Sequence, residues 1–175
     1  LAAALNARLE GLHDVDPRSI EIIKFNNRDE YHVKNVVHDY MMHSFLYADT
    51  VDREEAVRMI GRRMGFLATA LLEELEDGDR IFVYRSSVRD LTPDELDTLS
   101  QAMRARGTNV LLYVKYADEA HPSGSVEWAN DGLMVGYIDH FSVDRAGAFL
   151  QPSVWEWRRI CQTAWEMWQR HRAAA

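Results

Sequence analysis

Cysteine is almost absent from this chain, which has a single one, Cys161, among its 175 residues. One thiol excludes an intrachain disulfide and fits a reducing compartment, so we expect a cytoplasmic protein. No apolar run approaches the ~20 residues that a membrane-spanning helix needs. The net charge of −8 argues against a general nucleic-acid binder. We therefore expect neither a membrane nor a nucleic acid as partner.

Several motifs that indicate known chemistries are missing as well. The chain has no Gly-x-Gly-x-x-Gly and no Gly-Lys-Ser/Thr loop, the two standard nucleotide cradles, and no Gly-x-Ser-x-Gly hydrolase elbow. No cysteine pattern or Glu-x-x-His spacing supports a metal site at His32, His38 and His43, which we interpret as solvated or packing residues. We expect no metal and no cofactor.

The stretch 79–116 is the most informative part of the sequence. Residues 80–85 form a β-rich run, Thr92-Pro93-Asp94-Glu95 has the pattern of a capped helix start, and Gly107 supplies a stop. A second apolar strand follows at 109–115. This order predicts a parallel βαβ crossover, and the carboxyl ends of parallel strands form the rim where α/β sheets bind ligands.

The remaining segments complete an α/β pattern. We predict a helix over 2–12, strands over 20–25 and 31–40, and a long helix that ends at Gly78. The segment 126–138 is predicted to be either a hairpin or a helix-turn-strand. A Trp-rich helix starts at Ser153. The predicted fold class is α/β, a three-layer sandwich with a mainly parallel central sheet flanked by helices, in a single domain over 1–175. The first residues have the pattern of a helix already under way, so we expect the C-terminal part of a longer protein.

His38 and Asp39 are candidate catalytic residues at the end of the predicted strand 31–40. A histidine at a strand end can serve as a general base when a carboxylate orients its ring. The alternative is a histidine that hydrogen-bonds only its own loop. A His-Asp dipeptide does not distinguish the two.

Charged side chains at two places are candidate ligand-binding residues. Arg62 lies one turn after Arg58 on the long helix, and paired arginines recognise phosphate or carboxylate groups, although Glu54 and Glu55 also fit a solvated helix face. The second place is the carboxyl rim, where we expect Arg85, Asp118, His121 and Asp139.

Cys161 lies within the Trp-rich helix. It shares a 3-4 spacing with Val154, Trp157, Trp165 and Trp168, which is typical of a buried stripe. We therefore predict a core residue and not a nucleophile, because a catalytic thiol needs an electropositive and accessible setting.

Five segments carry a resemblance to a known family: Val37-His38-Asp39, Arg62-Arg63 with Phe66-Leu67, Ile81-Phe82-Val83-Tyr84, Asn109-Val110-Leu111-Leu112 and Gly136-Tyr137-Ile138-Asp139-His140-Phe141. Together they are similar to a bacterial family described as papain-like cysteine peptidases, whose members often occur near or fused to glycan-modifying enzymes. The similarity spans Leu1 to about Met167.

The resemblance implies a thiol hydrolase or transferase with His38 as general base and Asp39 or Asp139 as the acid that orients it. The family's cysteine lies in a motif upstream of the first helix and nothing here matches it, so we expect a truncated enzyme without its nucleophile. The alternatives are a non-catalytic glycan- or nucleotide-sugar-associated binding module of a larger enzyme, which would use the rim, and a purely structural unit. The expected partner is a small molecule, a glycan or a peptide.

Overall fold

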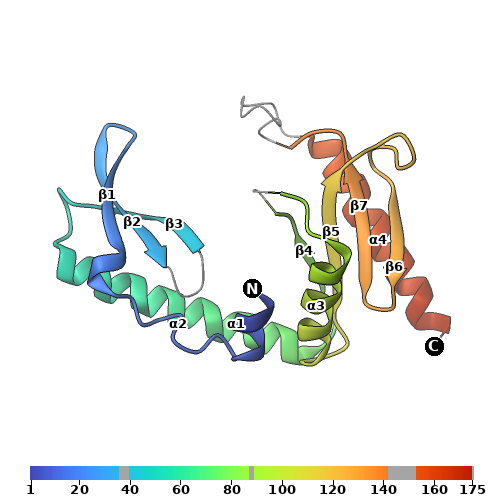
Figure 1. Cartoon of the computed structure of the whole chain (residues 1–175), viewed down its shortest axis with the longest axis horizontal. Coiled ribbons are helices and arrows are strands. Elements are labelled where there is room, and N and C mark those ends of the chain that lie inside the picture. Colours follow the sequence, from blue (N-terminus) through green and yellow to red (C-terminus); the bar gives the residue numbers. More distant parts are fainter. Residues whose placement is uncertain (36–39, 87–88, 142–152, 175) are drawn as a thin grey trace. The chain divides into compact units, whose positions relative to one another are not determined.

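The computed structural model of the protein describes residues 1–35, 40–86, 89–141 and 153–174 (Figure 1). These residues form two compact units, Leu1–Glu74 and Leu75–Ala175. Each unit has a hydrophobic cluster of its own. The single domain predicted from the sequence stays a prediction. Helix α2 (Arg53–Asp77) runs across the boundary between the units.

The first unit contains a three-stranded antiparallel sheet in the order β1-β2-β3. Asn26 and Asn27 form the β1–β2 turn with φ of 50° and 61°, as a two-residue type I′ hairpin requires. The strand predicted over 31–40 corresponds to β2, the predicted first helix ends early, and β3 was not predicted. The elements before α2 are α1 (Ala2–Asn6), the 3-10 turn η1 (Pro17–Ser19), β1 (Ile20–Phe25), β2 (Arg28–Asn35) and β3 (Tyr40–Tyr47).

One face of this sheet packs against α2. Tyr31 and Val33 of β2 are buried in one cluster with Ile60 and Met64 of α2. Because successive residues of a strand point to opposite faces, Glu30 is on the other face of β2.

The second unit contains a four-stranded sheet in the order β4-β5-β7-β6. Strands β4 and β5 are parallel neighbours separated in sequence by α3, which confirms the predicted βαβ unit. Strand β7 is parallel to β5, and β6 and β7 form an antiparallel hairpin. The elements are β4 (Ile81–Tyr84), α3 (Pro93–Arg104), β5 (Val110–Tyr116), β6 (Val126–Asn130), β7 (Leu133–Ile138) and α4 (Val154–Ala174).

Local chemistry explains where α3 begins. The Thr92 hydroxyl accepts a hydrogen bond from Glu95 N (3.3 Å), and the Glu95 carboxylate accepts one from Thr92 N (2.9 Å). This is the predicted capping box, with Pro93 at the first helical position.

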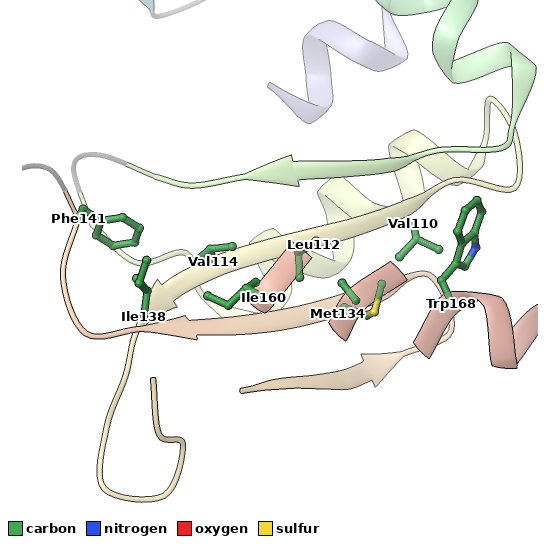
Figure 2. Packing of buried hydrophobic residues seen from close by; sticks show 9 residues of the cluster. Val110, Leu112, Val114, Met134, Ile138, Phe141, Ile160 and Trp168 are labelled. Atoms are coloured by element: carbon green, nitrogen blue, oxygen red, sulfur yellow. The ribbon is translucent and has the colours of Figure 1, made fainter. Parts of the chain in front are cut away.

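Helix α4 packs on β5 and β7 through alternate strand residues (Figure 2). Ile160, Ala164 and Trp168 form its buried stripe. A Cβ at Gly136 would lie 2.7 Å from Ile160 Cγ2, so the absence of a side chain at Gly136 lets the helix approach β7 closely.

The prediction that Cys161 is buried is wrong, because Cys161 is exposed. Ile160 and Ala164 occupy the buried positions predicted for Cys161 and Trp165, and Trp165 is exposed. Trp168 is buried, as the predicted stripe requires. The close fit of Ile160 on Gly136 is possible in only one rotation of the helix, and this rotation leaves Cys161 exposed.

The α/β class is confirmed by helices that accompany two sheets. A three-layer sandwich around one mainly parallel central sheet is not confirmed, because the strands lie in an antiparallel sheet and a mixed sheet. No helix among the described residues is long and apolar enough to cross a membrane.

Candidate active site on the antiparallel sheet

Glu30 is a fully buried carboxylate in β2, on the sheet face that turns away from α2. A charge removed from water needs hydrogen-bonded partners. Phe45 N donates to Glu30 Oε1 at 2.8 Å, and His43 Nδ1 lies 3.0 Å from Glu30 Oε2. Each carboxylate oxygen therefore has one donor from β3.

The balance of these contacts keeps Glu30 ionised. Burial raises the pKa of the Glu30 carboxyl, but the hydrogen bonds from Phe45 N and His43 and the nearby His43 and His32 outweigh it, so the pKa lies below its ordinary value. An ionised carboxylate only accepts hydrogen bonds, so Nδ1 of His43 carries the proton. A ring that carries its one proton on Nδ1 has its lone pair on Nε2.

The His43 ring is held among aromatic neighbours and remains 40% exposed. The ring centroid of Phe25 is 4.6 Å away, that of His32 5.2 Å and that of Phe45 6.0 Å. His32 and His43 are direct cross-strand partners. Packing on several sides limits the orientations of the imidazole, while its exposed part can reach a ligand.

The backbone that supplies one of the donors is strained. Phe45 has φ of 58°, a left-handed conformation that bulky residues rarely adopt. Its neighbours hold it there: the Ser44 hydroxyl donates to Tyr31 O and accepts from Leu46 N (3.0 Å), and Arg63 Nη1 donates to Ser44 O (2.7 Å). Phe45 lies where the register of β2 and β3 shifts, and in this conformation its N–H contacts Glu30.

A His–carboxylate pair of this kind can take up and release a proton. Among the residues that the structure describes, no group of three or more His, Cys, Asp or Glu side chains is arranged to hold a metal ion.

The predicted catalytic residues do not form this pair. His38 and Asp39 lie outside the described residues, so their predicted roles stay predictions. Asp139 is in the second unit, where its carboxylate accepts from His140 N (2.8 Å) and Ser153 Oγ (3.1 Å). Burial raises the pKa of the Asp139 carboxyl. The hydrogen bonds from His140 and Ser153 lower this pKa by more than burial raises it, so it lies below its ordinary value.

Arg62 occupies an exposed face of α2 in the first unit. Its Nη2 donates to Glu55 Oε1 (3.2 Å), and Arg58 pairs with the same carboxylate at 2.7 Å. This arrangement fits the solvated helix face that was the alternative to a ligand site.

The other three predicted rim residues follow the carboxyl ends of β4 and β5. Asp118 and His121 meet, with 2.7 Å between Asp118 Oδ1 and His121 Nδ1. The second ring nitrogen of His121 is 3.6 Å from Glu127 Oε1, so both nitrogens face carboxylates. Arg85 has a different contact. Its guanidinium carbon lies 3.8 Å from the centroid of the Phe141 ring.

The Glu30–His43 pair was missed because β3 was not predicted. The apolar residues Tyr31 and Val33 alternate with Glu30 and His32, which places the two polar residues on one face. A glutamate and a histidine two positions apart on one strand face were the available signal. Comparisons with protein families, curated proteins and solved structures found no match.

Proposed function

We propose that the first unit carries the general-base centre of a hydrolase or group-transfer enzyme, with His43 as base and Glu30 as the residue that positions it. The observation that supports this most is the hydrogen bond of 3.0 Å between the buried Glu30 carboxylate and Nδ1 of His43, whose imidazole is partly exposed. No bond to His43 Nε2 is present among the described residues, in contrast to His121, whose two nitrogens both face carboxylates.

The chemistry follows from the tautomer. Nε2 of His43 accepts a proton from an attacking water, hydroxyl or thiol, and Glu30 stabilises the imidazolium that forms. The same proton then passes to the leaving group. The resemblance to papain-like peptidases assigns the base to His38; we assign it to His43, since a buried orienting carboxylate contacts that ring.

Turnover of an activated ester tests the proposal without knowledge of the natural substrate. We expect the chain to accelerate hydrolysis of p-nitrophenyl acetate, and His43→Gln to abolish the acceleration. His13→Gln is the matched control, because His13 is an exposed histidine of the same unit that lies 3.4 Å from Asp14. Equal rates for the His43→Gln and His13→Gln variants would contradict a special role for His43.

Arg85 favours a second function, in the other unit. Its Nε is buried without an acceptor, and no carboxylate pairs with it among the described residues. A guanidinium held on an aromatic ring binds carboxylate or phosphate groups by forked hydrogen bonds. We propose that the carboxyl rim binds the anionic group of a small molecule, as a binding module would.

An NMR titration with inorganic phosphate and with acetate tests this second proposal. The Phe141 amide should shift, and Arg85→Gln should remove the shift. Arg89→Gln is the control, because Arg89 already pairs with Glu95. Shifts that survive Arg85→Gln would place anion binding elsewhere.

A further inference from the structure

The second unit has a cavity of about 400 Å³ at the amino ends of its parallel strands, the edge opposite to the carboxyl rim. The start of β5, the β6–β7 turn and the last turns of α4 line it. Figure 2 shows Val110 and Trp168 together at this end of the hydrophobic cluster and Phe141 at the other. Ligand pockets commonly measure ~300–1,000 Å³. The cavity therefore has room for a ring with its substituents.

The charges in its walls are matched. Arg104 donates from Nη2 to Asp131 Oδ2 at 2.8 Å and from Nη1 to the Asp131 carbonyl, and Arg172 Nη1 pairs with Asp79 Oδ1. His171 Nε2 lies 3.3 Å from Asp131 Oδ1. Two guanidinium groups and two carboxylates leave no excess positive charge for a phosphate, which the aspartates would repel. A neutral hydroxyl, in contrast, accepts from an arginine and donates to an aspartate.

The same walls contain an aromatic surface. Half-buried Trp128 lies against His171, with 5.1 Å between ring centroids. An indole packs well on the apolar face of a ring.

We propose that this cavity binds a single sugar residue, a neutral ring with many hydroxyl groups. Its hydroxyls bridge the Arg104–Asp131 and Arg172–Asp79 pairs, and its apolar face packs on Trp128. This site is separate from the Glu30–His43 centre and does not depend on the proposed reaction.

An NMR titration of the whole chain with the methyl α- and β-pyranosides of glucose, galactose, mannose and N-acetylglucosamine tests the proposal. At least one glycoside should shift the Trp128 indole N–H and the Val110 and Gly132 amides. Asp131→Asn and Arg172→Gln, at exposed positions, should each weaken that binding by about tenfold. Inorganic phosphate should cause no comparable shifts.

Trp155→Ala is the matched control, because Trp155 is an exposed tryptophan of α4 that does not line the cavity. It should bind the glycoside as the unaltered chain does, and circular dichroism should show the same fold for all variants. The proposal is overturned if no glycoside shifts the cavity residues, if phosphate binds there more tightly, or if Asp131→Asn and Arg172→Gln bind the glycoside as well as Trp155→Ala.

Discussion

Replacing Glu30 by glutamine tests the candidate active site most directly, because it removes the charge and keeps the shape of the side chain. Glu30 accepts bonds from Phe45 N at 2.8 Å and from His43 Nδ1 at 3.0 Å. A hydrogen bond to a charged acceptor contributes ~1.5–3 kcal/mol and a neutral one ~1 kcal/mol. A buried amide also loses less solvation than a buried carboxylate.

These terms predict a modest loss of stability for Glu30→Gln. Both contacts persist in neutral form, so the free energy of unfolding should fall by about 1 kcal/mol at neutral pH. Glu30→Leu leaves Phe45 N–H and His43 Nδ1–H buried without an acceptor and should cost about 3 kcal/mol. Urea unfolding of the two variants beside the unaltered chain measures the difference.

The effect on the imidazole should be much larger than the effect on stability. The glutamine amide faces His43 Nδ1 with a donor, so the ring proton moves to Nε2 and the lone pair is lost from the exposed side. Inverting the tautomer of a catalytic histidine lowers turnover by ~10⁴-fold. We expect a loss of that order in ester hydrolysis and a change of tautomer in the ¹⁵N spectrum of the imidazole.

The stability difference should depend on pH in a definite direction. The pKa of Glu30 is lowered from its ordinary value of 4.5 in the folded state, so its contribution is complete above that pH and is lost as the pH falls through the folded pKa. The unaltered chain should therefore lose its advantage over Glu30→Gln in acid, below about pH 4.5. An advantage that stays constant down to strong acid, or an unchanged tautomer in the variant, would refute this reasoning.

Three further predictions concern the second unit. Gly136→Ala should destabilise it by ~1–3 kcal/mol in urea unfolding, because the new Cβ would lie 2.7 Å from Ile160 Cγ2; unchanged stability would contradict the close packing. Cys161 should react with iodoacetamide in the folded protein, faster as the pH rises, because it is exposed while partial burial raises the pKa of its thiol. The hydrogen bonds from Arg89 and from the Thr92 backbone lower the pKa of Glu95 to about 2. The contribution of Glu95 to stability should therefore be lost as the pH falls from about 4.5 toward 2, and Glu95→Gln should remove that part of the acid dependence.

The sequence by itself determined the elements whose causes lie within a few residues. The capping box of Thr92 and Glu95 bonds backbone and side-chain groups three positions apart, so the start of α3 could be predicted. The turn between β6 and β7 contains Gly132 at φ of 102°, which glycine readily adopts, and the hairpin was one of the predicted alternatives. The parallel pairing of β4 and β5 followed from the helix between them.

Only the tertiary structure decided the candidate site and the rotation of α4. His43 and Glu30 are 13 residues apart and meet because the register of β2 and β3 places them together, while β3 lacks the alternation that reveals a strand. The same limit applies to Cys161: an apolar stripe of tryptophans fits two rotations of the helix, and the fit of Ile160 against Gly136 selects one. Hydrogen bonds within a turn are encoded locally, whereas strand register and the fit of packed surfaces depend on residues distant in the chain.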